Sequence, residues 1–425
     1  MRRLAIVFIF VLIFSVFSFC RKDALSQGTA GLNNPTLSAS ALAQGNAFVA
    51  RADDASAIQF NPAGLTQLQG PQVSQGVSFI LPSVEYQNNS VSEDMDTNIN
   101  IIPNIYFASP IIKNKLAAGL GITVPYGLNG EWDDDGFSRY VVTGFNLRII
   151  NINPTITYKP LSCLSIGVGF DYYYANSSQE SRIPFSLITG TPDGHSDLDM
   201  HGDGFGYNTG ILYNITPHHS IGVSFRSKAD INFDGKLKQS GFPVGVFGFD
   251  RFNSQATTSA TIPEMLSFGY AYRHGDLWSI EADVQWTNWS RFDILNIGLE
   301  PPNPLRGAEV EDVRNWHNTW SFALGGEYAL SEAIKVRGGY TFHETPVPSD
   351  TFEPSVPQSS RHGLFTGLGY SWGKKLNKGL DFAYGAVFYE NRKIDNSIGD
   401  AFGTPIDGRY DLITHIMAIN FNYRF

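Results

Sequence analysis

The chain has 425 residues and a formal net charge of −10, with 31 Phe, 19 Tyr and 42 Gly but only two Cys. The acidic balance excludes nucleic acid as an expected partner, because phosphate binding needs basic patches, and two cysteines are too few for a disulfide-rich secreted scaffold. Mean hydropathy is near neutral, which a transmembrane β-barrel also shows, because its strands alternate lipid-facing and lumen-facing side chains.

The N-terminus carries the features of an export signal. The first three residues include two arginines, residues 4–19 are apolar apart from serines, and residues 24–26 provide the small side chains that a signal peptidase reads. The apolar run is short for a membrane-spanning helix, so an uncleaved anchor is the weaker interpretation, as is a lipoprotein at Cys20. We therefore expect residues 1–26 to be a signal peptide and the mature protein to be exported.

Residues 27–70 lack the alternation of a strand. They are rich in Gly, Ala, Ser and Asn, and Asn61-Pro62-Ala63 predicts a turn. A barrel of more than about eight strands has room inside for such a segment. We expect residues 27–70 to fold into the lumen as an N-terminal plug, or hatch, with Asn61, Pro62 and Ala63 as its turn motif.

The remaining residues, 71–425, form a series of two-faced strands in our interpretation. Residues 278–287 show the pattern best, because apolar side chains at even positions alternate with Glu281, Asp283 and other polar side chains at odd positions. Successive side chains of a strand point to opposite faces, and charges on the inner face favour a wet lumen over the dry core of a soluble sandwich. Counting gives about fourteen strands, an even number as in bacterial barrels. Their expected centres are Val77, Ile105, Leu120, Ile152, Val168, Thr209, Val223, Leu266, Ala282, Phe322, Val336, Thr366, Ala386 and Met417.

Short and long connections alternate along the chain after residue 70. This asymmetry is typical of outer-membrane barrels, which have short periplasmic turns and long outer loops. The tight turns are expected at 113–114, 159–160, 217–218, 274–275, 331–332 and 374–375. The long loops are expected near 87–97, 126–144, 181–199, 235–250, 291–314, 345–359 and 392–409. We therefore predict an all-β, antiparallel transmembrane barrel of about fourteen strands, with the plug inside its lumen, in the Gram-negative outer membrane.

Three prolines count against this strand assignment, and the last strand supports it. Pro103, Pro154 and Pro263 lie inside expected strands, although proline cannot donate to the ladder and a closed barrel has no edge. Bulges or strand ends are the expected resolution. The last strand alternates apolar side chains and closes with Tyr423 and Phe425, which resembles the signal that the outer-membrane barrel assembly machinery recognises, so this machinery is an expected partner.

A set of motifs occurs in a particular order along the chain. They are Gly45-Asn46-Ala47, Ala52-Asp53-Asp54-Ala55, Asn61-Pro62-Ala63, Ile262-Pro263-Glu264-Met265, Trp286-Thr287-Asn288-Trp289-Ser290, Arg337-Gly338-Gly339-Tyr340, Thr345-Pro346-Val347-Pro348 and Arg361. Together they resemble the FadL/TodX family of outer-membrane hydrophobic-compound (long-chain fatty acid) transporters, over essentially the whole mature chain. The resemblance implies a fourteen-stranded barrel closed by an N-terminal hatch. It also implies ligand capture among outer loops, a pocket near the hatch, and lateral exit through a wall opening at a kinked third strand.

The third expected strand ends on the sequence Val-Pro-Tyr-Gly at residues 124–127. Proline and glycine can break a ladder, so we expect the kink at Pro125 and Gly127, with the start of a loop as the alternative. An intact ladder from Leu116 through Gly127 would exclude the kink. A lateral route suits an apolar ligand, because a fatty acid gains roughly 0.8 kcal/mol per buried methylene and loses that gain in a water-filled pore.

No catalytic constellation emerges from the sequence. His218-His219 fits surface histidines better than a catalytic base, and the three aspartates at 133–135 fit a solvated acidic loop better than a calcium site. We expect no catalytic residue, no metal, no cofactor and no enzyme activity.

Four basic residues face the lumen if the alternation is followed. Each is a candidate partner for a ligand carboxylate, or else part of a lumenal charge network with acidic side chains. They are Arg226, Lys228, Lys335 and Arg337.

The sequence thus predicts a monomeric, passive outer-membrane transporter of a hydrophobic small molecule, first of all long-chain fatty acids, surrounded by outer-membrane lipids. Three alternatives remain. A general porin for small polar solutes would lack the segment 27–70, an adhesive or structural barrel would work through its outer loops, and an outer-membrane enzyme would need a convergent nucleophile–base–acid set.

Overall fold

The computed structural model describes residues 32–96, 99–396, 398–400 and 405–425. The predicted signal peptide lies outside the described residues, and the predicted division into signal peptide, plug and barrel stays a prediction. Within the described part, no helix is long and apolar enough to cross a membrane.

The strands are β1 (Gln72–Gln87), β2 (Ser92–Asp94), β3 (Asn100–Ile112), β4 (Leu116–Glu131), β5 (Gly144–Leu161), β6 (Leu164–Ile183), β7 (Gly194–Asn214), β8 (His219–Arg226), β9 (Ala229–Ser240), β10 (Arg251–Ile262), β11 (Met265–His274), β12 (Trp278–Thr287), β13 (Ile294–Asn303), β14 (Gly307–Val313), β15 (Thr319–Ala329), β16 (Ile334–His343), β17 (Arg361–Trp372), β18 (Lys378–Tyr389), β19 (Arg392–Ile394) and β20 (Gly408–Arg424). The short helices are α2 (Ala39–Leu42), α3 (Ala57–Phe60), η1 (Pro62–Gln67), α4 (Phe185–Ile188), α5 (Val244–Phe247), η2 (Trp289–Arg291) and η3 (Lys374–Leu376).

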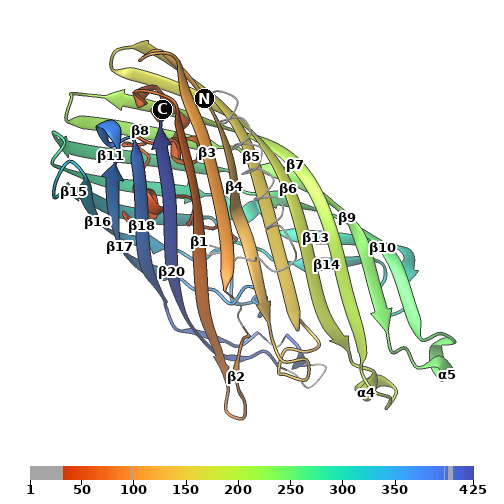
Figure 1. Ribbon diagram of the computed structural model, residues 1–425. Helices are drawn as coiled ribbons and strands as arrows, with labels where there is room; N and C mark the ends of the chain where they lie inside the picture. The colour runs from red at the N-terminus through yellow and green to blue at the C-terminus, as the bar shows by residue number, and fades with distance from the viewer. Residues whose placement is uncertain (1–31, 97–98, 397, 401–404) are drawn as a thin grey trace.

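The strands form one closed antiparallel barrel of 14 strands, as predicted. Each of the 14 strands of the wall pairs with the wall strands before and after it in the chain, and β1 closes the barrel by pairing with β20 along its whole length (Figure 1). Four wall strands are interrupted, so that β8 with β9, β10 with β11, β12 with β13, and β14 with β15 each make one strand of the wall. Every expected strand centre falls in a different wall strand.

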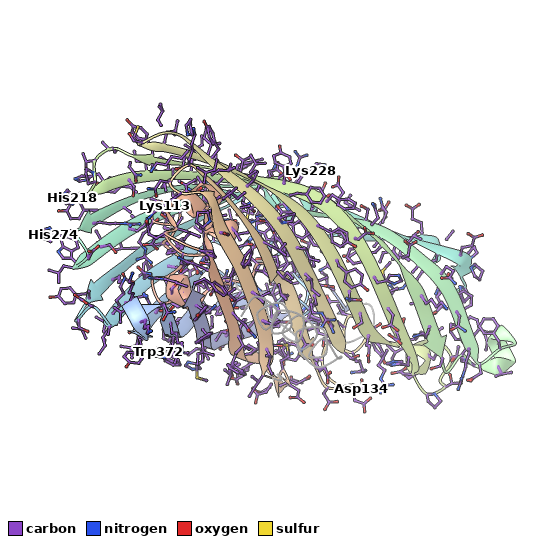
Figure 2. All side chains as sticks on the ribbon, turned by 45° about the horizontal axis from the view of Figure 1, so that its top comes forward. Lys113, Asp134, His218, Lys228, His274 and Trp372 are labelled. Carbon is purple, nitrogen blue, oxygen red and sulfur yellow. The ribbon has the colours of Figure 1, made fainter. Side chains whose placement is uncertain are left out.

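The two faces of the wall have opposite chemistry. On β12 the side chain of Ile280 is 44 % exposed on the outside, whereas Glu281 is 3 % exposed on the inside. Tight turns gather at one end of the barrel, where Figure 2 labels Lys113, His218 and His274, and longer connections such as that of Asp134 lie toward the other. This is the arrangement that the alternating short and long connections predicted.

One long loop was predicted wrongly. Residues 291–314 were expected as a connection, but β13 and β14 form a hairpin there that pairs with β10. Leu295 and Ile297 of this hairpin face the lumen, but Pro301, Pro302 and the acidic residues of β14 interrupt the alternation that would have indicated a strand.

The three prolines are accommodated by defects in the ladders. Pro263 lies in the interruption between β10 and β11, and Pro154 lies where pairing of β5 with β6 lapses between Ile152 and Thr155. Pro103 pairs with Val77 on one side, while its stretch of β3 has no partner on the β4 side. Strand ends and unpaired edges are the positions where proline costs least.

Residues 32–70 lie inside the barrel and are called the inner segment here. Their backbone approaches lumen-facing glycines on widely separated strands of the wall: a Cβ added to Gly167 of β6 would lie 2.5 Å from the carbonyl carbon of Pro62, and one added to Gly339 of β16 would lie 2.1 Å from that of Gln44. Only glycine permits such contacts. The inner segment therefore spans the lumen from β6 to β16.

Candidate functional site

Two carboxylates of β12 hold the middle of the inner segment. Asp283 Oδ2 accepts the backbone N–H groups of Phe48 at 2.8 Å and Val49 at 3.0 Å. Glu281 accepts those of Ala50 and Arg51. Four consecutive backbone N–H groups of the inner segment thus find their acceptors on one strand, and each such hydrogen bond contributes at least about 0.5–1.5 kcal/mol.

The predicted turn motif forms the second attachment of the inner segment. The fully buried Asn61 donates from Nδ2 to the Val49 carbonyl at 2.8 Å and to the Ile211 carbonyl of β7 at 3.0 Å. Its Oδ1 accepts the N–H of Ala63, and the carbonyl of Pro62 accepts from Thr157 Oγ1 at 2.6 Å. The motif therefore joins two parts of the inner segment and ties both to the wall.

Arg226 belongs to a buried network that also holds the inner segment. Its guanidinium is ion-paired with Asp171 and donates to the Gln59 carbonyl at 3.3 Å. Asn151 and Asn153 each donate to Asp171 at 2.7 Å. The charge of Arg226 is thus already balanced, so its predicted contact with a ligand carboxylate competes with Asp171.

Lys335 and Arg337 also have acidic partners. Glu327 accepts from Lys335 at 2.7 Å and from Arg337 at 2.7 Å, and Asp381 pairs with Arg337 at 2.5 Å. These side chains lie together in the lumen near the turn end of the barrel, where they form the charge network that was the alternative interpretation. Ligand contact by either residue stays a prediction.

Lys228 was predicted to face the lumen, and the structure corrects this. Lys228 lies on the outer surface with a side chain 47 % exposed, ion-paired to Asp230 at 3.2 Å (Figure 2). Lumen-facing positions are even in β8, as at Arg226, but odd in β9, as at Ala229. Between β8 and β9 the chain has one residue more than a continuous strand would have, so the lumen-facing positions change from even to odd numbers.

Charged side chains of the inner segment form ion pairs near the turn end of the barrel. Asp53 pairs with Arg51 at 3.3 Å and with Arg273 at 3.4 Å. Burial alone would raise the pKa of Asp53, but these two guanidinium groups hold that pKa below its usual value.

A cavity of about 160 Å³, the outer cavity, lies in the loop half of the lumen. Its walls are mainly aliphatic and aromatic side chains. Arg314 reaches it, but Asp312 and Glu353 both pair with this guanidinium at 2.5 Å. The apolar lining includes Leu128, Phe145, Leu147, Ile149, Leu198, Met200, Ile231, Phe233, Ala260, Ile297 and Val356.

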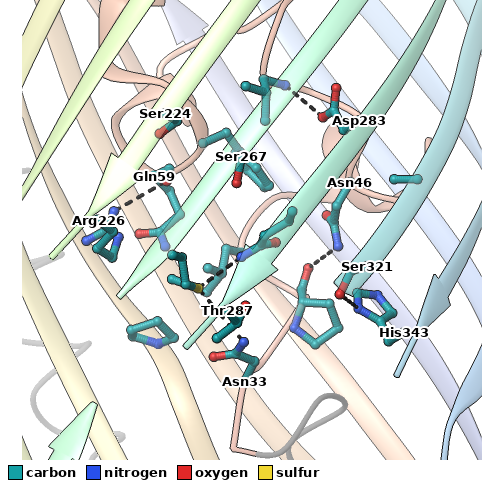
Figure 3. Close-up of a pocket in the computed structure, with 18 of the residues that line it drawn as sticks. Asn33, Asn46, Gln59, Ser224, Arg226, Ser267, Asp283, Thr287, Ser321 and His343 are labelled. Atoms are coloured by element: carbon teal, nitrogen blue, oxygen red, sulfur yellow. Dashed lines mark hydrogen bonds between the residues drawn. The ribbon is translucent and has the colours of Figure 1, made fainter. Parts of the chain in front are cut away.

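A second cavity of about 160 Å³, the inner cavity, adjoins the outer cavity and touches the inner segment (Figure 3). It is more polar, with Ser267, Thr287, Ser321 and His343 among its lining residues. Tyr126 and Trp289 line both cavities and separate them. The sequence did not mark Tyr126 and Trp289 as site residues, although Tyr126 lies between Pro125 and Gly127, and Trp289 belongs to the motif at residues 286–290.

The β3–β4 ladder is interrupted beside Tyr126. Pairing of β3 with β4 ends at Ile105–Ile122, and the next backbone pairing on this side joins Asp96 to Glu131. On the other side, the register of β4 against β5 shifts by one residue between Thr123 and Tyr126. Within the described part of the chain, residues 123–130 of β4 therefore have no strand of the wall paired with them on the β3 side. We call this interval the wall gap. Pro125 and Gly127 lie within it.

The start of the inner segment borders the wall gap. Asn34 donates its N–H to the Pro125 carbonyl at 2.8 Å, and the N–H of Gly127 donates to the Leu32 carbonyl at 3.0 Å. Asn34 Nδ2 also donates to the Val124 carbonyl at 2.9 Å. The chain near residue 33 thus satisfies the free edge of β4 that β3 leaves open.

Two neighbouring loop tips carry exposed apolar side chains at the loop end of the barrel. α4 exposes Leu187 by 58 %, and α5 exposes Val246 by 66 % (Figure 1). Behind them, Phe185 and Phe242 pack with ring centroids 5.1 Å apart and contact further phenylalanines. Exposed apolar groups that are gathered in this way mark interaction sites.

The terminal residues Tyr423 and Phe425 lie at the turn end of β20, with Phe425 60 % exposed. Their role as an assembly signal stays a prediction. Among the described residues, no group of three or more His, Cys, Asp or Glu side chains is placed to hold a metal ion.

Comparison with known proteins gives a consistent result. The family model described as "Outer membrane protein transport protein (OMPP1/FadL/TodX)" matches residues 24–425. A "Long-chain fatty acid transport protein" of Escherichia coli O6:H1 is 28 % identical, with 88 % of this chain and 89 % of that protein covered. A putative outer membrane protein of Neisseria meningitidis serogroup B is 27 % identical, with 95 % and 96 % covered.

Solved structures share the fold. A Pseudomonas aeruginosa FadL homologue superimposes with a TM-score of 0.83 at 19 % identity, covering 93 % of this chain and 100 % of that one. The P. putida toluene transporter TodX superimposes with a TM-score of 0.71 at 14 % identity, covering 94 % and 99 %.

Proposed function

The chain belongs to the OMPP1/FadL/TodX family of outer membrane transport proteins and is an outer-membrane β-barrel, and on this premise we propose that it carries long-chain fatty acids across the outer membrane passively. Members of the family are transporters of hydrophobic compounds rather than enzymes. The proposed route runs from the loop tips through the outer and inner cavities and leaves sideways through the wall gap.

The observation that carries this proposal is the alignment of two adjoining cavities with the wall gap. Tyr126 separates the two cavities and is itself part of the unpaired stretch of β4. A movement of this one residue therefore affects both passage between the cavities and the opening in the wall. The mostly apolar outer cavity suits the alkyl chain of a ligand, because each buried methylene contributes roughly 0.8 kcal/mol.

The loop tips at α4 and α5 supply the proposed capture site. Leu187 and Val246 present apolar surface beyond the wall, where a ligand arrives from outside. Capture at this surface followed by transfer to the outer cavity keeps an alkyl chain in contact with protein throughout.

The inner segment is the proposed hatch. It is tied to β12 by Glu281 and Asp283 and to β7 by Asn61, and it fills the lumen that a general porin would keep open. A ligand that leaves through the wall gap meets outer-membrane lipid directly, once the start of the hatch at residues 32–34 has moved away from the free edge of β4. We further propose that the protein acts as a monomer, since this route lies within one barrel, and that Tyr423 and Phe425 address it to the barrel assembly machinery.

Replacing Ala260 by Trp tests the outer cavity as the ligand site. Ala260 lines this cavity on β10, so the indole occupies space that the alkyl chain needs. Displacing two methylenes costs roughly 1.6 kcal/mol, and we therefore expect the affinity of the purified protein for a radiolabelled long-chain fatty acid to fall by more than about tenfold.

The matched control for Ala260→Trp is Ile156→Trp, which adds an indole to the lipid-facing side, where Ile156 is 53 % exposed. This control is expected to bind like the unmodified protein. Equal affinities of Ala260→Trp and the unmodified protein would rule out the outer cavity as the ligand site.

A further inference from the structure

Arg361, the first residue of β17, is a buried cation with no counter-ion among the residues that the structure describes. Its side chain is 1 % exposed, and within the same part of the chain its Nε and Nη2 atoms have no hydrogen-bond partner. Its Nη1 atom donates to Gln358 Oε1 at 3.4 Å, and the guanidinium lies 5.5 Å from the ring centroid of Tyr389. An unpaired charge is expensive to bury, so its donors are available to an incoming acceptor.

A second arginine increases the positive charge at this place. Arg392 donates to the carbonyl oxygens of Gln358 and Val347, the latter at 2.6 Å, and lies over the ring of Phe352. In the part of the chain that the structure describes, neither Arg361 nor Arg392 forms an ion pair. By contrast, the lumenal Arg226, Arg314 and Arg337 each pair with at least one carboxylate.

This positive site adjoins the inner cavity. Ser321, His343 and Arg361 lie opposite one another on β15, β16 and β17, with their side chains toward the lumen. Directly opposed side chains of neighbouring strands are about 4.5–5.5 Å apart at Cβ. Ser321 and His343 line the inner cavity, side by side in Figure 3, so the guanidinium of Arg361 lies one side chain behind that wall.

We propose that Arg361, supported by Arg392, binds the ionised carboxylate of a long-chain fatty acid at the inner cavity, while the alkyl chain extends into the outer cavity. This inference rests on the proposed function and specifies its substrate class. Guanidinium and carboxylate form two parallel, charge-assisted hydrogen bonds, and the free Nε and Nη2 atoms are two donors on one side of the guanidinium fork. A neutral hydrocarbon would leave both donors unpaired, so the site selects acids over hydrocarbons of equal length.

The test compares a radiolabelled C18 fatty acid with the fatty alcohol of the same chain, using the purified full-length barrel in detergent. Arg361→Met is expected to weaken binding of the acid by at least about tenfold, the loss expected for hydrogen bonds to a charged group, and to change binding of the alcohol by less than about twofold. Arg361→Lys retains the charge and is expected to restore part of the preference for the acid.

Arg273→Met is the matched control, because Arg273 is a cation near the turn end of the barrel that already pairs with Asp53 and lines neither cavity. This variant is expected to keep the preference for the acid. Arg361→Met removes a buried charge that has no carboxylate partner, so it leaves no acidic group unpaired and is expected to fold. Folding is verified by electrophoresis, in which a folded barrel migrates differently before and after heating. Equal weakening of acid and alcohol, or no weakening of either, would overturn the inference while leaving the proposed function intact. Failure of the unmodified protein to bind either compound would overturn both.

Discussion

Deletion of Pro125 is expected to abolish uptake of long-chain fatty acid by a barrel that still folds and still binds its ligand. Between Thr123 and Tyr126, β4 has one residue more than the facing part of β5. Removing Pro125 eliminates this extra residue and leaves Val124 opposite Ile150, so the ladder between β4 and β5 becomes continuous. Proline, which cannot donate to a ladder, is lost at the same time. Without the extra residue, β4 is expected to run straight and to extend its pairing with β3 beyond Ile105–Ile122. This pairing closes the wall gap and with it the lateral exit, and uptake into proteoliposomes is expected to fall to the level of protein-free vesicles.

The control for this deletion is Pro125→Ala, which keeps the extra residue in β4 and is expected to keep most of the uptake. Ligand binding measured on both variants separates loss of exit from loss of the site. Normal uptake by the deletion variant, with its barrel folded, would mean that the ligand leaves by another route.

The double replacement Glu281→Ala with Asp283→Ala is expected to make the barrel leaky to small polar solutes. These two carboxylates accept all four backbone N–H groups of residues 48–51. A buried N–H group without an acceptor costs about 1–3 kcal/mol, so the inner segment loses its main attachment to β12. Liposome swelling in a small sugar is expected to become clearly faster than with the unmodified protein.

Gln285→Ala provides the comparison for the double variant. Gln285 lies on the same face of β12 but donates to Met265 Sδ rather than to the inner segment. This variant is expected to exclude the small sugar as well as the unmodified protein does. If the double variant also excludes the sugar, the inner segment is held by other contacts, such as those of Asn61.

The fold could be predicted because the membrane imposes a simple pattern on each strand. The alternation of Ile280 with Glu281 is visible in the sequence and directly reports the two faces of the wall. Pro263 indicated the interruption between β10 and β11, but the one between β8 and β9 was not predictable, since one extra residue changes neither composition nor hydropathy. The wrong orientation of Lys228 has this cause. The hairpin of β13 and β14 was missed because Pro301 and Pro302 interrupt its alternation.

The candidate site was only partly predictable, because its residues meet through closure of the barrel. Pro125 and Gly127 were singled out by their chemistry, and they lie in the wall gap. Tyr126 and Trp289 are far apart in the sequence, and no local pattern shows that they border the same two cavities. Whether a buried cation has a counter-ion depends on contacts between strands, so the sequence could not separate Arg361 from lumenal arginines that are paired.

The most direct measurement of the central claim is uptake by proteoliposomes that contain the intact protein and no energy source, with a radiolabelled long-chain fatty acid and a small sugar offered together. The account predicts that the fatty acid enters down its gradient at a rate well above that of protein-free vesicles, while the sugar stays outside. Entry of the sugar without faster entry of the fatty acid would contradict the account and identify the barrel as a general porin.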